Sequence, residues 1–217
     1  MKVLFASSNP HKVKEVREIL QPAGVQVMSL DDLPAEKVAE EPEEDGMTFA
    51  ENARIKAIAY ARASGMLTLA DDSGLVVDAL HGEPGVHSAR YAMDVIGEEE
   101  FDEMPRAMRD SANNTKLLAK LKNVPVQKRK ARFVCAMCLT DSHGHVKTET
   151  EGVFEGVIVD TMHGTNGFGY DPLLYVEDAG CTSAEMTAEE KNRRSHRGQA
   201  ARKMVNTLRQ EALGIKH

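Results

Sequence analysis

The chain has 217 residues, of which 41% are hydrophobic and 28% charged, and its formal net charge is −7. This hydrophobic share is enough for a packed core and excludes global disorder. No apolar run reaches the roughly 18 residues that a membrane-spanning helix needs, and three cysteines are too few for a disulfide scaffold. The negative charge argues against nucleic acid as partner, because proteins that bind it normally carry a basic surplus. We therefore expect a cytoplasmic protein without membrane contacts, whose partners are small molecules.

The first half of the chain alternates strand and helix signals. Asn9-Pro10 predicts a helix start, because Asn caps well and Pro is tolerated at the first helical position. Thr48 and Glu51 have the spacing of a capping box, which predicts a second helix. Gly74 predicts a turn between two strands. The expected strands are short apolar runs: residues 3–6, 25–28, 67–70 and 75–80.

The second half continues the alternation. A helix is expected to include residues 116–121, and a capping box at Thr187 and Glu190 precedes a C-terminal helix. Residues 142–145 predict a hairpin turn. Interleaved strands and helices indicate an α/β fold, and the hairpin makes its sheet mixed. The expected strands here are residues 132–140, 153–159 and 173–176.

A first candidate site follows the first strand, in Ser7-Ser8-Asn9-Pro10-His11-Lys12. A helix N-terminus offers unpaired N–H groups and partial positive charge, so it favours anions. The hydroxyls, the Asn9 amide and Lys12 would complete a phosphate cradle. The alternative interpretation is an ordinary helix cap with a surface lysine.

A second candidate joins the acidic loop around Glu44 to one helix face. Thr48, Asn52 and Lys56 are spaced four residues apart, so they share that face. The loop carboxylate could hold a metal ion and the lysine a phosphate, unless the stripe is simply solvated.

A third candidate is Asp71-Asp72-Ser73-Gly74, where two acids end an apolar strand. Neighbouring side chains of a strand point to opposite faces, so a continuing strand would turn only one acid toward a given site. Such a carboxylate can hold Mg²⁺ or serve as a general base. The sequence is equally good turn chemistry.

Two further candidates lie late in the chain. The glycine-rich segment 164–172 carries Phe168 and Tyr170, either of which could stack on a nucleobase, and Asp171 could accept from a ring N–H. His196 and Arg197, near Lys191, are donors suited to carbonyl or phosphate oxygens. The alternatives are a glycine-rich turn with core aromatics and a basic, solvated helix end.

Taken in order, these segments closely resemble the inosine triphosphate pyrophosphatase family, which removes non-canonical purine nucleotides. The resemblance covers about residues 3–208, with 92–112 as a gap. It rests on six blocks: Ser-Ser-Asn-x-x-Lys12, Glu-Glu-x-Gly-x-Thr-Phe-x-Glu-Asn52, Ala-Asp-Asp-Ser-Gly-Leu75, Pro-Gly-x-x-Ser-Ala-Arg-Tyr91, Gly-Phe-Gly-Tyr-Asp-Pro172 and Glu-Lys-x-x-x-Ser-His-Arg-Gly-Gln-Ala200.

The resemblance implies a mixed, twisted sheet flanked by helices, with two lobes and a substrate cleft between them. It implies one pyrophosphatase domain over residues 1–217, with 92–112 as a surface insertion, and a homodimer. The implied reaction is Mg²⁺-dependent hydrolysis of ITP, dITP and XTP to the nucleoside monophosphate and pyrophosphate.

The resemblance also implies roles for single residues. Asp72 is the expected general base, with Asp71 as a lesser candidate, and Glu44 and Asp72 are the expected metal ligands. Arg90 is expected to close the base pocket. The expected phosphate-binding residues are Ser7, Asn9, Lys12 and Lys56. The expected residues around the base are Ser73, Gly74, Phe168, Gly169, Tyr170, Asp171, Lys191, His196 and Arg197.

The resemblance also implies that His196 and Arg197 discriminate between bases as hydrogen-bond donors. Hypoxanthine and xanthine present a 6-keto acceptor where adenine presents an amino donor, and a buried unpaired donor costs about 1–3 kcal/mol. Two other functions fit the same residues: a pyrophosphatase for modified pyrimidine nucleotides, and a nucleotide-binding module without catalysis. Two segments depart from the family pattern. The long 92–112 segment could contact the rim of the base pocket or the dimer interface, and the lead-in His163–Asn166 bears on base selectivity.

Overall fold

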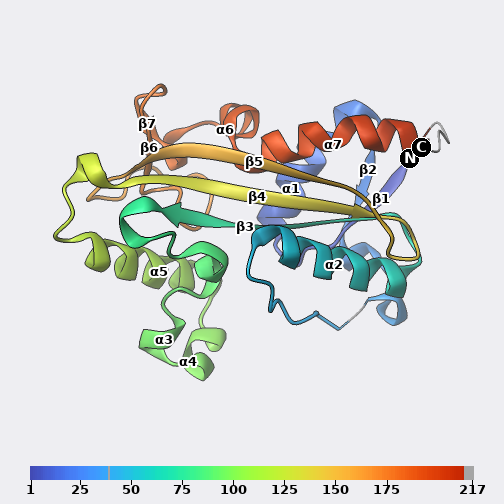
Figure 1. Ribbon diagram of the computed structural model, residues 1–217, viewed down its shortest axis with the longest axis horizontal. Coiled ribbons are helices and arrows are strands. Elements are labelled where there is room, and N and C mark those ends of the chain that lie inside the picture. The colour runs from blue at the N-terminus through green and yellow to red at the C-terminus, as the bar shows by residue number, and fades with distance from the viewer. Residues whose placement is uncertain (39, 213–217) are drawn as a thin grey trace. The chain divides into compact units, whose positions relative to one another are not determined.

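The structure of the chain, a computed structural model, describes residues 1–38 and 40–212. Seven strands form one sheet in the order β2-β1-β3-β4-β5-β6-β7 (Figure 1). β1 is parallel to β2 and β3, whereas β6 is antiparallel to β5 and β7. The predicted mixed α/β fold is therefore confirmed. The strands are β1 Lys2–Phe5, β2 Gln26–Met28, β3 Thr68–Val77, β4 Lys130–Thr140, β5 Val146–Ile158, β6 Leu174–Val176 and β7 Cys181–Thr182.

Seven α-helices in the described part of the chain accompany the sheet, together with short 3₁₀ segments. They are α1 Pro10–Leu20, α2 Phe49–Ser64, α3 Met93–Ile96, α4 Glu98–Glu103, α5 Arg106–Leu121, α6 Ala188–Arg194 and α7 His196–Ala212. Among these described helices, none combines the length and the apolar character needed to cross a membrane.

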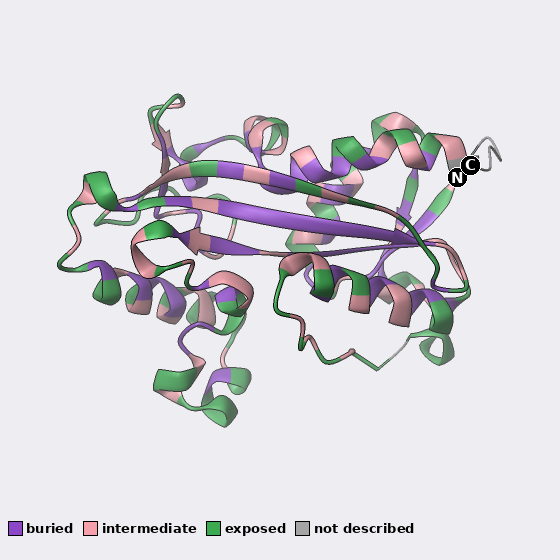
Figure 2. Cartoon of the chain, in the orientation of Figure 1, coloured by how far each residue is buried: buried purple, intermediate pink, exposed green. Residues whose placement is uncertain are grey.

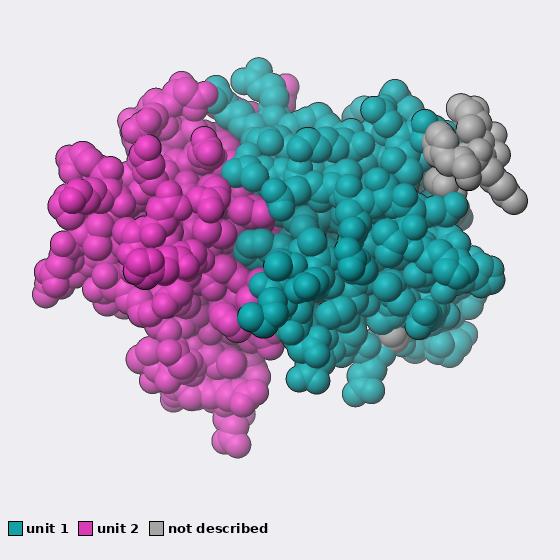
Figure 3. Space-filling view, viewed as in Figure 1, with its two compact units in different colours: residues 1–72, 135–153, 192–217 teal, residues 73–134, 154–191 magenta. Residues whose placement is uncertain are grey.

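The chain divides into two compact units, which Figure 3 colours separately. Unit 1 consists of residues 1–72, 135–153 and 192–217, and unit 2 of residues 73–134 and 154–191. Because the boundaries fall within strands, β3, β4 and β5 each contribute residues to both units.

The core of unit 1 has two layers, one on each face of its strands. In β1, Val3 and Phe5 pack in the cluster that contains α1 and α7, whereas Leu4 packs in the cluster that contains α2. This alternation follows from the two-residue period of a strand. The middle of β4 is buried on both faces, because one layer of the core covers each face (Figure 2).

The two helices that begin next to the candidate site start where their caps predict. The Asn9 side chain accepts a hydrogen bond from the backbone N–H of His11 at 3.0 Å, and α1 begins at Pro10. Thr48 and Glu51 form both hydrogen bonds of a capping box at the start of α2. These bonds satisfy backbone donors that the first turn of a helix leaves unpaired.

The core of unit 2 joins its part of β3 to α5. Leu75 and Val77 pack with Leu117 and Leu121 in one buried cluster. The segment 92–112 forms α3, α4 and the first turns of α5, and its Phe101 is fully buried. This segment is therefore folded around a buried side chain of its own.

The prediction of a turn at Gly74 is wrong, because β3 runs unbroken from Thr68 to Val77. The glycine is needed for close approach instead. A Cβ at position 74 would collide with the Ser88 hydroxyl and would lie 2.6 Å from the carbonyl oxygen of Gly85. The expected start of β5 at residue 153 is also wrong, because the strand begins at Val146 with alternating exposed polar side chains.

Gly74→Ala is expected to lower the free energy of unfolding by about 1–3 kcal/mol, because overpacking forces backbone and side chains to shift. Urea denaturation followed by circular dichroism measures this change. Ser111→Ala, on the exposed surface of α5, is the control and should change stability by less than about 0.5 kcal/mol. An unchanged unfolding midpoint for Gly74→Ala would contradict the close approach.

Candidate active site

The two adjacent acids of β3 point to opposite faces of the strand. Leu69 packs in the cluster of α1 and α7, and Asp71 lies two residues further on the same face. Ala70 packs in the cluster of α2, and Asp72 follows it on that face. The prediction that a continuing strand would separate the pair is therefore confirmed by their contacts.

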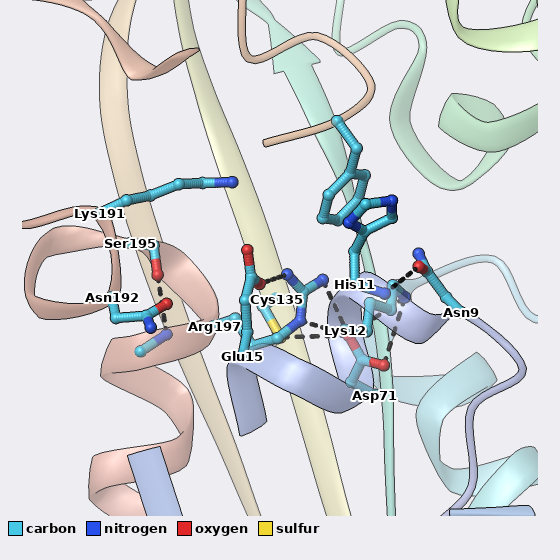
Figure 4. A network of polar contacts seen from close by, with 12 residues as sticks. Asn9, His11, Lys12, Glu15, Asp71, Cys135, Lys191, Asn192, Ser195 and Arg197 are labelled. Carbon is cyan, nitrogen blue, oxygen red and sulfur yellow. Dashed lines mark hydrogen bonds and ion pairs between the residues drawn. The ribbon is translucent and has the colours of Figure 1, made fainter. Parts of the chain in front are cut away.

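Asp71 binds two cations on the α1 and α7 face (Figure 4). Lys12 Nζ lies 3.1 Å from Asp71 Oδ2, and Arg197 donates to the same oxygen from Nε at 3.2 Å and Nη2 at 3.1 Å. The Cys135 thiol lies 3.7 Å from this carboxylate. Asp71 and Arg197 are each only 1% exposed. Arg197 Nη1 also donates to Glu15 Oε2 at 2.6 Å.

The charges around Asp71 decide its protonation. Burial raises the pKa of Asp71, but Lys12 and Arg197 outweigh burial and hold that pKa well below its usual range. The same burial, together with the Asp71 charge, raises the pKa of the Cys135 thiol. Asp71 is therefore ionised near neutral pH and anchors two cations, and Cys135 stays a neutral thiol.

A glycine of β5 allows α7 to bring Arg197 to this place. A Cβ at Gly152 would collide with the carbonyl oxygen of His196, the first residue of α7. Gln199 Nε2 donates to the carbonyl oxygen of Val153 at 2.6 Å and further fixes the helix start on the strand. His196 is buried at this junction.

Asp72 faces a different set of partners on the α2 side. Asn52 Nδ2 donates to Asp72 Oδ2 at 3.1 Å, and Lys56 Nζ lies 3.7 Å from Asp72 Oδ1. Lys56 Nζ also donates to Glu44 Oε2 at 3.1 Å. Asn52 Oδ1 in turn accepts from the backbone N–H of Gly46 at 2.8 Å. One amide thus connects the acidic loop to the middle of β3.

The pKa of Asp72 is shifted in the opposite direction from that of Asp71. Burial raises the pKa of Asp72, and Lys56 only partly offsets that effect. For Lys56, burial lowers the pKa but the carboxylates of Asp72 and Glu44 outweigh it, so its pKa is raised. A lysine that stays charged between two carboxylates marks a place where oxygen ligands converge, and the raised pKa of Asp72 makes its carboxylate more basic than that of Asp71.

The expected phosphate-binding residues surround the N-terminus of α1. Ser7 Oγ accepts a hydrogen bond from the backbone N–H of Asn9 at 3.3 Å, and Asn9 is itself buried. Lys12 lies within the first turn of the helix. The hydroxyl, the amide and the ammonium group thus occupy one helix start, a position that favours anions.

The aromatic loop before β6 belongs to unit 2. Phe168 is half-buried, and its backbone N–H donates to Asp171 Oδ2 at 2.8 Å. Lys191 Nζ donates to the same oxygen at 2.7 Å and lies 5.1 Å from the centroid of the Phe168 ring. Ser183 donates to the other carboxylate oxygen at 2.8 Å. Asp171 therefore organises its own loop around Phe168.

The remaining expected site residues vary in exposure. Tyr170 is buried in the core of unit 2 and donates to the carbonyl oxygen of Ser88 at 2.8 Å, so Phe168 is the aromatic ring left to stack on a base. Ser73 is half-buried in β3, Gly74 is buried there, and Arg90 is exposed.

The expected residues thus fall into two groups. Unit 1 contains Ser7, Asn9, Lys12, Glu44, Lys56, Asp72, His196 and Arg197. Unit 2 contains Ser73, Gly74, Phe168, Gly169, Tyr170, Asp171 and Lys191.

Sequence reasoning did not single out Glu15, the partner of Arg197. Glu15 is three residues after Lys12 on α1, so the two share one helix face, but its contact with Arg197 joins residues 182 positions apart. The sequence indicates Asn52 only as part of a polar stripe. The hydrogen bond from Asn52 to Asp72 forms because β3 and α2 pack together.

Comparison with known proteins identifies the family of this chain. The profile of the Ham1 family matches residues 3–207. This chain belongs to the Ham1 family. The dITP/XTP pyrophosphatase of Desulforamulus reducens is 48% identical over 208 residues, which cover 96% of each chain. That of Thermus thermophilus is 45% identical over 209 residues, covering 96% of this chain and 92% of the relative.

The fold agrees with that of solved members of the same family. The structure of a HAM1 protein from Coxiella burnetii superposes with a TM-score of 0.81 at 36% identity and covers 97% of this chain and 99% of that one. The family predicted from the six sequence blocks is therefore confirmed.

Asp71→Asn is expected to lower the free energy of unfolding by about 3–5 kcal/mol at pH 7, because it leaves two buried cations without their shared charge. Since the folded pKa of Asp71 is lowered, its stabilisation is present above the unfolded pKa of about 3.9 and is lost as pH falls below it.

Urea denaturation at pH 7 and at pH 3 measures both effects. Asp102→Asn, on the exposed surface of α4, is the control and should leave stability within about 0.5 kcal/mol. A loss below about 1 kcal/mol for Asp71→Asn at pH 7 would show that the two cations do not depend on this carboxylate.

Proposed function

We propose that this chain hydrolyses the non-canonical purine nucleotides ITP, dITP and XTP to nucleoside monophosphate and pyrophosphate. The observation that carries the proposal is the buried carboxylate of Asp72, held by Asn52 and Lys56 opposite Glu44. Its raised pKa suits a group that must take a proton from water. The names of the related pyrophosphatases from Desulforamulus reducens and Thermus thermophilus support the substrate class.

The phosphates would be held by residues of unit 1. Ser7, Asn9 and the N-terminus of α1 would donate hydrogen bonds to phosphate oxygens, and Lys12 and Lys56 would supply positive charge. Asp71 supports this by holding Lys12 at 3.1 Å, so the lysine is positioned before substrate arrives. Preorganised cations stabilise charge that develops during phosphoryl transfer.

The donor set around Lys56 fits Mg²⁺. Hard cations prefer carboxylate oxygens and usually bind one or two protein carboxylates together with substrate phosphates. Glu44 and Asp72 supply two carboxylates within 3.1 and 3.7 Å of the Lys56 ammonium nitrogen, an arrangement that supports a shared cation site. When bound there, Mg²⁺ would neutralise charge on the triphosphate.

The protein residues would then direct the attack. Asp72 would orient a water molecule and accept its proton as the water oxygen bonds to the α-phosphorus. The bond from the α-phosphorus to its bridging oxygen would break, and pyrophosphate would leave with that oxygen. Lys12 and Lys56 would stabilise the negative charge on the phosphates.

The base would be selected through its 6-keto oxygen. Phe168 would stack on the purine, with Ser73, Gly169, Tyr170 and Asp171 shaping its surroundings. His196 would donate to the 6-keto oxygen and Lys191 would contact the purine, while Arg197, which Asp71 and Glu15 hold, would support His196 from the next position of α7. Adenine would place an amino donor against these donors, at a cost of about 1–3 kcal/mol for each unpaired group. The proposal includes a cytoplasmic homodimer, as the family resemblance implies.

A panel of ITP, XTP, ATP, GTP and a modified pyrimidine triphosphate tests the proposal through pyrophosphate release. We expect rapid release from ITP and XTP with Mg²⁺, loss of activity with EDTA, and at least tenfold slower release from ATP, which corresponds to roughly 1.4 kcal/mol.

Asp72→Asn is the matched variant, because it keeps the shape of the side chain and removes the base. It should lower kcat by roughly 10²–10⁴-fold while nucleotide binding persists. Release from the pyrimidine nucleotide alone, or an unchanged kcat in this variant, would contradict the proposal.

A further inference from the structure

One face of α5 contacts the loop that carries Phe168. Arg106, Asp110 and Asn114 are spaced four residues apart, so they lie along one side of the helix. The backbone N–H of Gly169 donates to Asp110 Oδ2 at 3.0 Å. Asn114 Nδ2 donates to the carbonyl oxygen of Gly169 at 3.0 Å. Both backbone polar groups of one loop residue are therefore bound by this helix.

The third residue of this face reaches the aromatic ring itself. The guanidinium carbon of Arg106 lies 5.3 Å from the centroid of the Phe168 ring, within the range of a cation–π contact. Arg106 Nε also lies 4.0 Å from Asp110 Oδ2. The carboxylate of Asp110 therefore has both Gly169 and Arg106 as neighbours.

Phe168 is consequently restrained on both sides along the chain. Its own N–H donates to Asp171, and the next residue is bound to α5. Gly167 and Gly169 both have positive φ angles, of +77° and +62°, which L side chains rarely adopt. Two such glycines leave the loop little intrinsic conformational preference, so these contacts determine where the ring lies.

The environment of Asn114 indicates that its amide positions the loop at Gly169 more than it stabilises the fold. Its side chain is only 3% exposed, and its Oδ1 has no hydrogen-bond partner in the described part of the chain. A buried unpaired acceptor is destabilising. The amide is explained by its N–H bond to Gly169, which a hydrophobic side chain could not make.

We propose that Arg106, Asp110 and Asn114 are positioning residues of the nucleobase subsite. They hold the Phe168 ring in place for stacking, and so they determine the affinity for the base while leaving phosphorus–oxygen cleavage to unit 1. This inference rests on the proposed function, because that function assigns the base to Phe168. It also gives a role to the end of segment 92–112, which carries Arg106 and Asp110.

Two isosteric variants test the hydrogen bonds. Asn114→Asp replaces the donor that faces the Gly169 carbonyl with an oxygen, and it should raise KM for ITP and the Kd for IMP by at least roughly tenfold. Asp110→Asn keeps an acceptor oxygen for the Gly169 N–H and should change both by less than about threefold. Neither variant should change kcat for ITP or the Kd for inorganic pyrophosphate by more than about twofold.

Arg106→Gln tests the ring contact without disturbing the core, because Arg106 is exposed. It should weaken IMP binding by roughly two- to fivefold. Arg109→Gln, on the same helix, is its matched control and should bind IMP as the wild type does. Arg106→Gln also decides the question if Asn114→Asp fails to fold, as judged by thermal unfolding.

The outcomes separate the two proposals. A wild-type protein that neither hydrolyses ITP nor binds IMP would overturn the proposed function. In a second outcome, the wild-type protein hydrolyses ITP and binds IMP, while Asn114→Asp or Arg106→Gln binds IMP with wild-type affinity. That result would overturn only the positioning role. Equal losses of IMP and pyrophosphate affinity would also overturn it, because they would indicate general damage to the fold.

Discussion

The alternation of side chains along β3 is the constraint on which the rest of the site depends. Because the strand continues past residue 72, Asp71 and Asp72 face different helices despite being adjacent. Gly74 makes that continuation possible, since Ser88 and Gly85 approach it closely. A turn at Gly74 would free both acids from the strand, and two neighbouring carboxylates would then repel each other at one place.

The two acids consequently differ in charge behaviour. Asp71 lies between Lys12 and Arg197, which keep its pKa low, so it stays ionised and holds the cations of α1 and α7. Burial raises the pKa of Asp72, so its carboxylate beside Lys56 is more basic than that of Asp71. Geometry thus gives the two adjacent acids different partners and different charge behaviour. In unit 2, Asp171 and α5 hold the loop that carries Phe168.

The sequence predicted those features that depend on local chemistry. Caps at Asn9 and Thr48 fixed the starts of α1 and α2 because a cap acts within one turn. Gly74 was misinterpreted because glycine signals both turns and close approach, and Ser88 becomes its neighbour only after folding. The bond of Glu15 to Arg197 joins residues 182 positions apart, and the bonds of Asp110 and Asn114 to Gly169 likewise connect distant segments. Such contacts depend on packing, which local patterns do not encode.

The central claim, that water activated by Asp72 attacks the α-phosphorus, is tested most directly by hydrolysing ITP in ¹⁸O-labelled water. Mass spectrometry of the products shows which one carries the label. The account predicts one ¹⁸O atom in the nucleoside monophosphate and none in pyrophosphate, because the bond between the α-phosphorus and its bridging oxygen breaks. Label in the pyrophosphate, or in free phosphate, would contradict it by showing attack at the β- or γ-phosphorus.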